Sequence, residues 1–126
     1  MRYGTFVVGL VMAGGIVGPA LGHHSFAMFE SSDKRIDIEG TVREFQWTNP
    51  HVFIQVIVPG ADGKSTEWSV EGPPINMMAR SGWKRTSLVP GDKLTVTIRA
   101  LRDGSPGGLL VSAKKADGTV LGEAGP

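Results

Sequence analysis

The feature that most constrains the fold is a series of five short segments, each with the composition of a β-strand. They cover residues 35–43, 51–58, 66–70, 93–99 and 109–114. Polar and apolar residues alternate in most of them, which is the period of a strand with one buried face. Turns rich in glycine, proline and aspartate separate them, and the Asp62-Gly63 pair predicts a hairpin. We therefore expect a mostly β protein.

One short helix is predicted between the third and fourth strands. Pro73 and Pro74 precede residues 75–80, and Gly82 follows them. Proline at the start and glycine past the end are typical of a short helix. Three strands, a helix and two strands is the order of a five-stranded OB-like antiparallel barrel, which we expect here. An open antiparallel sheet or small sandwich with one covering helix is the alternative.

The strand period also predicts which side chains face the core. The inner set is Ile36, Ile38, Val42, Ile54, Val56, Trp68, Val70, Leu94, Val96, Ile98 and Val111. Phe45 and Trp47 have the opposite parity to Ile38 and Val42, so the first strand needs a bulge or bend between Gly40 and Glu44.

The first 22 residues have the plan of a cleaved export signal. Arg2 is followed by an apolar run over residues 6–17, then by Pro19 and the small residues Ala20 and Gly22. A membrane anchor is the competing interpretation, but the run is rich in glycine and ends without a charged stop. We expect a periplasmic or secreted protein with an irregular arm at 23–34, a barrel at 35–121 and a frayed tail at 122–126.

Composition excludes several classes of partner and site. The formal net charge of the 126 residues is +1, and loss of Arg2 with the signal would bring it to zero. A neutral chain has no basic field to hold nucleic acid and little attraction to a membrane surface, so we expect neither partner. The sequence has no cysteine. Disulfides, thiolate metal sites and cysteine nucleophiles are therefore excluded.

The sharpest chemical hypothesis concerns the three histidines, His23, His24 and His51. A cut after Gly22 would leave His23 first, so that its α-amine and imidazole could chelate one ion. His51 is the expected third nitrogen and His24 the next candidate. Nitrogen donors suit Cu(II), the strongest binder among the divalent ions. A cut before Gly22 would also leave a copper-chelating terminus, because His24 would then be the third residue of the chain. Two solvated histidines past a cleavage site are the alternative.

His51 itself has two interpretations. It follows Asn49-Pro50 and shares a strand face with Phe53 and Gln55, opposite the apolar Val52, Ile54 and Val56. In the structural interpretation it bonds a loop carbonyl at the mouth of the barrel. In the functional interpretation it is the partner of the terminal histidine.

A metal-free binding module is the rival function. It would bind a small apolar ligand or a protein partner through the aromatic residues Phe26, Phe29, Trp47 and Phe53. An enzyme is not favoured, because no paired acids or nucleophile-plus-base motif stands out. Glu39, Glu67 and Glu71 are expected to be solvated strand residues. An oxidative enzyme built on an N-terminal copper site has no substrate groove visible in the sequence.

Several segments resemble a known family. They are HHSF at residues 23–26, WTNPH at 47–51, GWKR at 82–85, LVPGD at 88–92 and LRDGSPGG at 101–108. Together they are similar to a family of small exported bacterial proteins classed as a domain of unknown function. The resemblance implies export and a small β-rich domain, without an established activity or catalytic residues. In architecture and composition the chain is also similar to small periplasmic copper- and silver-binding barrels.

Overall fold

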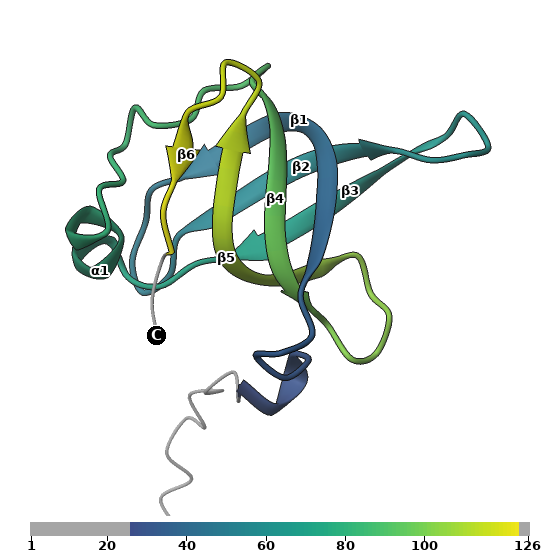
Figure 1. The fold of residues 1–126 in the computed structure, drawn as a ribbon, viewed down its shortest axis with the longest axis horizontal. Helices are drawn as coiled ribbons and strands as arrows, with labels where there is room; N and C mark the ends of the chain where they lie inside the picture. The colour runs from purple at the N-terminus through teal and green to yellow at the C-terminus, as the bar shows by residue number, and fades with distance from the viewer. Residues whose placement is uncertain (1–25, 124–126) are drawn as a thin grey trace, which may run out of the picture.

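The structure is a computed structural model that describes residues 26–123. The expected export signal, His23 and His24 lie outside the described residues. Six strands and two short helices follow one another (Figure 1): η1 Phe26–Met28, β1 Ile36–Gln46, β2 Phe53–Pro59, β3 Ser65–Glu71, α1 Ile75–Arg80, β4 Lys93–Ala100, β5 Gly107–Lys115 and β6 Val120–Leu121. Among these residues, no helix has the length and apolar character needed to cross a membrane.

The first five strands close into a barrel, which confirms the predicted OB-like fold. The strand order is β3-β2-β1-β4-β5, and β3 pairs with β5 to complete the circle. That closing pair is parallel and joins Ser69–Glu71 to Gly107–Leu109, whereas the other neighbouring strands run antiparallel. The predicted helix lies between β3 and β4. β6 is a short extra strand on β5 that the sequence did not predict.

The interior of the barrel is filled by aliphatic side chains from every strand. Ile38, Val42, Ile54, Val56, Val70, Leu94, Val96, Ile98 and, from β5, Leu110 are all buried in one cluster. Two predictions of inward orientation need correction. Ile36 is 45% exposed, because this end of β1 pairs with β4 alone and β2 joins it only from Thr41 onward, and Trp68 is only partly buried against the core. Val111 is buried outside the main cluster, because the β4–β5 register shifts between Thr97 and Ile98.

β1 has to coil sharply because it pairs with β4 in its first half and with β2 in its second. The predicted irregularity is present, since the register with β2 shifts between Val42 and Glu44. Gly40 allows the close approach: a Cβ there would overlap the carbonyl oxygen of Ile57 and lie 2.8 Å from Val56 Cγ1. The glycine therefore lets β1 bend across the barrel.

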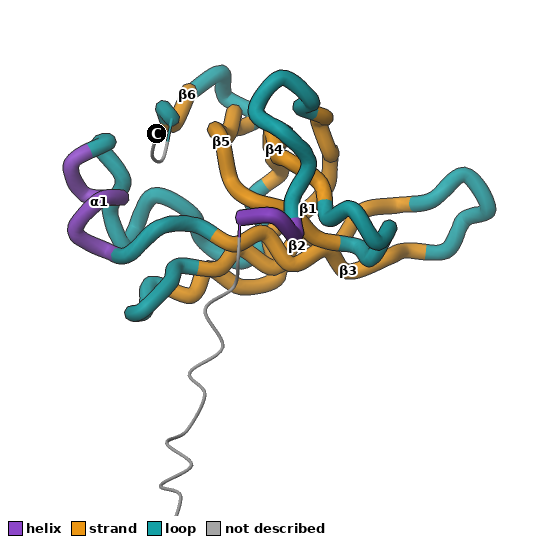
Figure 2. Tube along the Cα trace, turned by 90° about the horizontal axis from the view of Figure 1, so that it is seen from below, coloured by secondary structure: helices purple, strands orange, loops and turns teal. Residues whose placement is uncertain are grey.

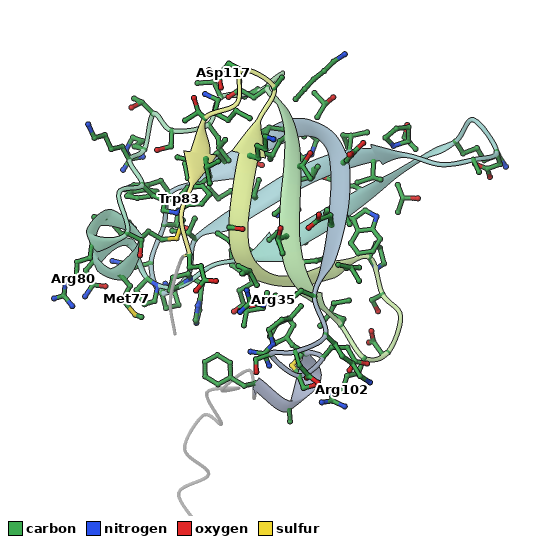
Figure 3. The ribbon with its side chains drawn as sticks, in the orientation of Figure 1. Arg35, Met77, Arg80, Trp83, Arg102 and Asp117 are labelled. Carbon is green, nitrogen blue, oxygen red and sulfur yellow. The ribbon has the colours of Figure 1, made fainter. Side chains whose placement is uncertain are left out.

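The segment around α1 packs against one side of the barrel, away from the β2–β3 hairpin, as Figure 2 shows. Met78 and Trp83 are buried, and Trp83 Nε1 donates a 3.2 Å hydrogen bond to the carbonyl of Gly122. Figure 3 shows Trp83 between α1 and β6. This one side chain therefore ties the helical segment to the C-terminal end of the described chain.

Candidate functional site

The described part of the N-terminal arm, residues 26–34, is held against the end of β4. Phe29 forms a β-bridge with Leu101 and is buried, and the backbone N–H of Glu30 donates to the carbonyl of Ala100 at 2.8 Å. Two arginines secure the arm. Arg99 Nε donates to the Glu30 carbonyl at 2.6 Å, and Arg102 Nε donates to the Phe29 carbonyl at 2.9 Å. Arg102 lies beside η1 in Figure 3.

A row of five outward-facing residues connects this arm to the region of His51. Strand pairing aligns Arg99 on β4, Leu109 on β5, Glu71 on β3, Phe53 on β2 and Gln46 on β1. We call it the cross-strand row. Adjacent strands lie about 4.8 Å apart, so the Arg99 and Glu71 positions are separated by roughly 10 Å across two strands. The arm itself bonds Ala100 and Arg102 on the edge of β4 opposite β5, so it lies about three strand spacings, roughly 14 Å, from the Glu71 position.

His51 is positioned by the chain just beyond β3. Its Nδ1 lies 3.1 Å from the carbonyl oxygen of Gly72 and 3.5 Å from Glu71 Oε1. A carbonyl only accepts, so Nδ1 carries the proton and donates it. In the neutral ring Nε2 then keeps its lone pair. The loop before His51 is held as well, since Thr48 Oγ1 donates to the His51 carbonyl and Asn49 Oδ1 accepts from the Ile75 N–H.

The bond to Gly72 is the interaction that the structural interpretation of His51 predicts. It does not exclude the functional one, because it occupies only Nδ1. A histidine that ligates a metal through one nitrogen commonly donates its other N–H to a backbone carbonyl or a carboxylate, which fixes the ring. The His51 side chain is 40% exposed. The arrangement therefore combines a fixed ring with partial access from solvent.

Glu71 differs from the expectation of a solvated strand residue. Its side chain is only 13% exposed and lies on the Nδ1 side of the His51 ring. The sequence offered a weak signal for this role, since Glu71 ends its strand directly before Gly72-Pro73-Pro74. Arg99 and Arg102 were also missed, because nothing in their local pattern indicates the distant arm residues that they bind.

The described residues do not supply a complete metal centre. Within residues 26–123, no three His, Asp, Glu or Cys side chains are grouped to hold an ion. Of the three histidines proposed as ligands, the structure places only His51. His23 and His24 precede the first described residue, Phe26, by three and two positions. A site that joins His51 to two other such side chains would therefore need at least one of them from outside the described range.

The aromatic residues proposed for the rival function are not equivalent. Phe26 is 69% exposed, whereas Phe29 is 4% exposed and belongs to the arm's packing. Trp47 is partly buried against the core and makes an edge contact with Phe45 at a centroid distance of 5.6 Å. Phe53 is half-buried in the cross-strand row. The four residues therefore do not form one exposed aromatic face.

The fold and this arrangement define a small OB-like barrel with an N-terminal arm fixed at the end of β4 and a half-buried histidine held by the chain after β3. A model of a family of unknown function (DUF6152) matches residues 11–112, and the chain belongs to that family. The matched range includes His23, His24 and His51. No curated protein and no solved structure matches the chain.

Proposed function

We propose that the protein is exported and binds Cu(II), or a related divalent metal, through His51 and the histidines that begin the processed chain. His23 would supply its α-amine and imidazole, and His51 would supply Nε2, with His24 as the next ligand. The observation that carries the proposal is the hydrogen bond from His51 Nδ1–H to Gly72, which directs ligation to Nε2. Cleavage of residues 1–22 is part of the proposal, because only a free amine completes the chelate.

The arm supports this proposal through its reach. His23 precedes Glu30 by seven residues, which span at most about 25 Å when extended. Glu30 is held on the edge of β4 opposite β5, about three strand spacings or roughly 14 Å from Glu71, which lies beside His51. If η1 unwinds so that these residues extend, the chain between them is long enough for the terminal histidine to meet His51 without disturbing the barrel.

The test is a copper titration of exported, processed protein whose first residue has been established by intact mass. We expect one Cu(II) per chain and weaker binding as the pH falls, because protons compete for the ligand nitrogens. His51→Ala, or one extra residue before His23, should each weaken binding at least about tenfold. Phe26→Ala is the matched control and should bind copper as the wild type does. If His51→Ala binds copper with wild-type affinity, then the N-terminus binds the ion by itself through generic chelation.

A metal-free binding module is the second candidate, favoured by one observation. Phe26 and Met28 of η1 both expose apolar surface on the fixed arm, at 69% and 42%. A partner of this module would contact these two residues, and its binding would not depend on His51. Unchanged copper binding in His51→Ala, together with a partner lost on Phe26→Ala, would make this candidate the better one.

A further inference from the structure

An open groove lies on the outer surface of β1, β4 and β5, separate from the cross-strand row. Its volume is about 490 Å³. The lining residues are Glu39, Gly40, Thr41, Pro59, Lys93, Leu94, Thr95, Lys114, Lys115 and Ala116. Thr95 precedes Arg99 by four positions on β4, so the groove lies roughly 13 Å along that strand from the arm. In Figure 3, Asp117 marks the turn that follows β5, at the end of the barrel opposite Arg102.

The strand register brings positive charges and hydroxyl groups together in this groove. Lys93 pairs with Thr41, while Thr95 pairs with Lys114 on one side and with Glu39 on the other. Lys93 and Lys114 are therefore diagonal neighbours, with Cα atoms roughly 7–8 Å apart. That spacing allows two flexible ammonium groups to converge on one bound group.

The charges in the groove are not neutralised by one another. Among the described residues, Lys93 and Lys114 form no ion pair, and the hydroxyls of Thr41 and Thr95 form no hydrogen bond. Lys115 differs, because its Nζ lies 3.5 Å from Asp92 Oδ2 and donates to the Ser87 carbonyl at 3.2 Å. Glu39 is the single carboxylate in the lining.

We propose that this groove binds a phosphoryl group, with Lys93 and Lys114 as the cationic donors and Thr41 and Thr95 as hydroxyl donors. Lysine recognises phosphate as a compact charge, and hydroxyls add donors around a tetrahedral oxyanion. A planar carboxylate is better matched by the fork of arginine, and the groove lining has no arginine. The ligand carrying the phosphoryl group is a soluble phosphate ester or a phospholipid headgroup, and the groove has room for more than the phosphate itself.

The primary experiment is an NMR titration of the processed protein with pyrophosphate at low salt. The largest amide shifts are expected at Thr41, Thr95 and Lys114, with small shifts in the hairpin at residues 60–64. Added sodium chloride should weaken binding, because the lysines are exposed and ionic screening shortens the range of their attraction. Shifts spread evenly over all surface lysines would overturn the proposal.

Variants with equal changes of charge separate a site from a general charge effect. Lys93→Ala/Lys114→Ala should weaken pyrophosphate binding at least about tenfold, because it removes both charged donors. Lys64→Ala/Lys84→Ala removes the same charge outside the groove and should stay within about twofold of wild type. Glu39→Gln should strengthen binding, since it removes the carboxylate that repels an anion. Equal weakening of pyrophosphate binding in both double variants would refute the groove as the binding site.

Vesicles identify the source of the phosphoryl group. Phosphatidylglycerol vesicles that bind the wild type but not Lys93→Ala/Lys114→Ala would indicate a lipid headgroup, with zwitterionic phosphatidylcholine as the control of zero net charge. Pyrophosphate binding without vesicle binding would indicate a soluble ester. If the protein binds neither pyrophosphate nor phosphatidylglycerol vesicles, the proposal is overturned. Copper binding should be unchanged in Lys93→Ala/Lys114→Ala, so failure of the groove and failure of the copper site can be distinguished.

Discussion

Arg99 Nε donates a 2.6 Å hydrogen bond to the backbone carbonyl of Glu30, which is 69 residues away in the sequence. Arg102 makes the equivalent bond to Phe29, so two side chains from the end of β4 and the turn after it fix two consecutive arm carbonyls. The carboxylate of Glu30 is also within ion-pair range of Lys34 and Arg102, at 3.6 and 3.9 Å. The arm is therefore a part of the folded barrel.

Loss of the arginine contacts should release the arm without unfolding the barrel. In Arg99→Gln/Arg102→Gln, hydrogen exchange at the amide of Glu30 should rise by an amount corresponding to about 1–3 kcal/mol, the expected value of charge-assisted bonds. Exchange in β2 should not change. Arg80→Gln, on the exposed end of α1, is the matched control. If the Glu30 amide exchanges in the double variant at the wild-type rate, the arginines are not needed and Phe29 alone holds the arm.

Gly40 should resist substitution more strongly than Gly72. A Cβ at position 40 would overlap the Ile57 carbonyl, whereas the nearest atoms at position 72 are an ordinary 3.5 Å away. Gly40→Ala should therefore lower the free energy of unfolding by about 1–3 kcal/mol, the usual cost of forcing atoms into a packed site. Gly72→Ala should cost less. Urea unfolding monitored by tryptophan fluorescence would measure both, and equal losses would contradict the proposed coil of β1.

The core can be tested with two isoleucines of opposite exposure. Ile54→Ala should lower the free energy of unfolding by about 2–5 kcal/mol, because the side chain is fully buried and a cavity remains. Ile36→Ala should cost much less, because Ile36 is already 45% exposed. Ile54→Asp should abolish stable folding, since it places an unpaired charge in an apolar interior. A soluble Ile54→Asp variant that unfolds cooperatively would show that the barrel interior is wrongly assigned.

Most of the fold could be predicted because strand period and turn composition are local properties. Leu94, Val96 and Ile98 show a clean alternation, and all three are buried as that pattern predicts. Ile36 continues the alternation of β1 and yet is exposed, because exposure depends on where the neighbouring strands end. Strand closure between β3 and β5 is a non-local pairing, so the sequence predicted it only through the order of elements.

The surroundings of the candidate site were less predictable for the same reason. His51 was identified because histidine is rare in this chain and its chemistry is distinctive. Its partners are Gly72, a backbone carbonyl, and Glu71, one of many carboxylates. Neither has a side-chain pattern that indicates contact with a residue about 20 positions earlier. The anchoring of the arm by Arg99 and Arg102 likewise depends on tertiary structure alone.

The turn between β4 and β5 should show a defined dependence on acid. Hydrogen bonds from the backbone N–H and hydroxyl of Ser105 hold the pKa of Asp103 below its ordinary value. A carboxyl group with a depressed folded-state pKa stabilises the fold above its unfolded pKa, and this contribution is lost as the pH falls through the folded value, below roughly pH 4. An NMR titration should give a lower midpoint for Asp103 in the folded protein than in urea. Equal midpoints would contradict the turn geometry.

Glu71 should affect the proposed copper site by positioning His51. Its carboxylate lies 3.5 Å from Nδ1, on the side of the ring that faces the Gly72 carbonyl, so it favours a proton on Nδ1 and a lone pair on Nε2. Glu71→Gln keeps the shape and removes the charge. We expect copper affinity to fall about tenfold, with an unchanged number of bound ions.

Glu67→Gln, on the same face of β3, is the matched control and should bind copper as the wild type does. The nitrogen hyperfine pattern in electron paramagnetic resonance should still include His51 in Glu71→Gln and lose it in His51→Ala. A Glu71→Gln protein with wild-type affinity would show that the Gly72 carbonyl alone holds the ring.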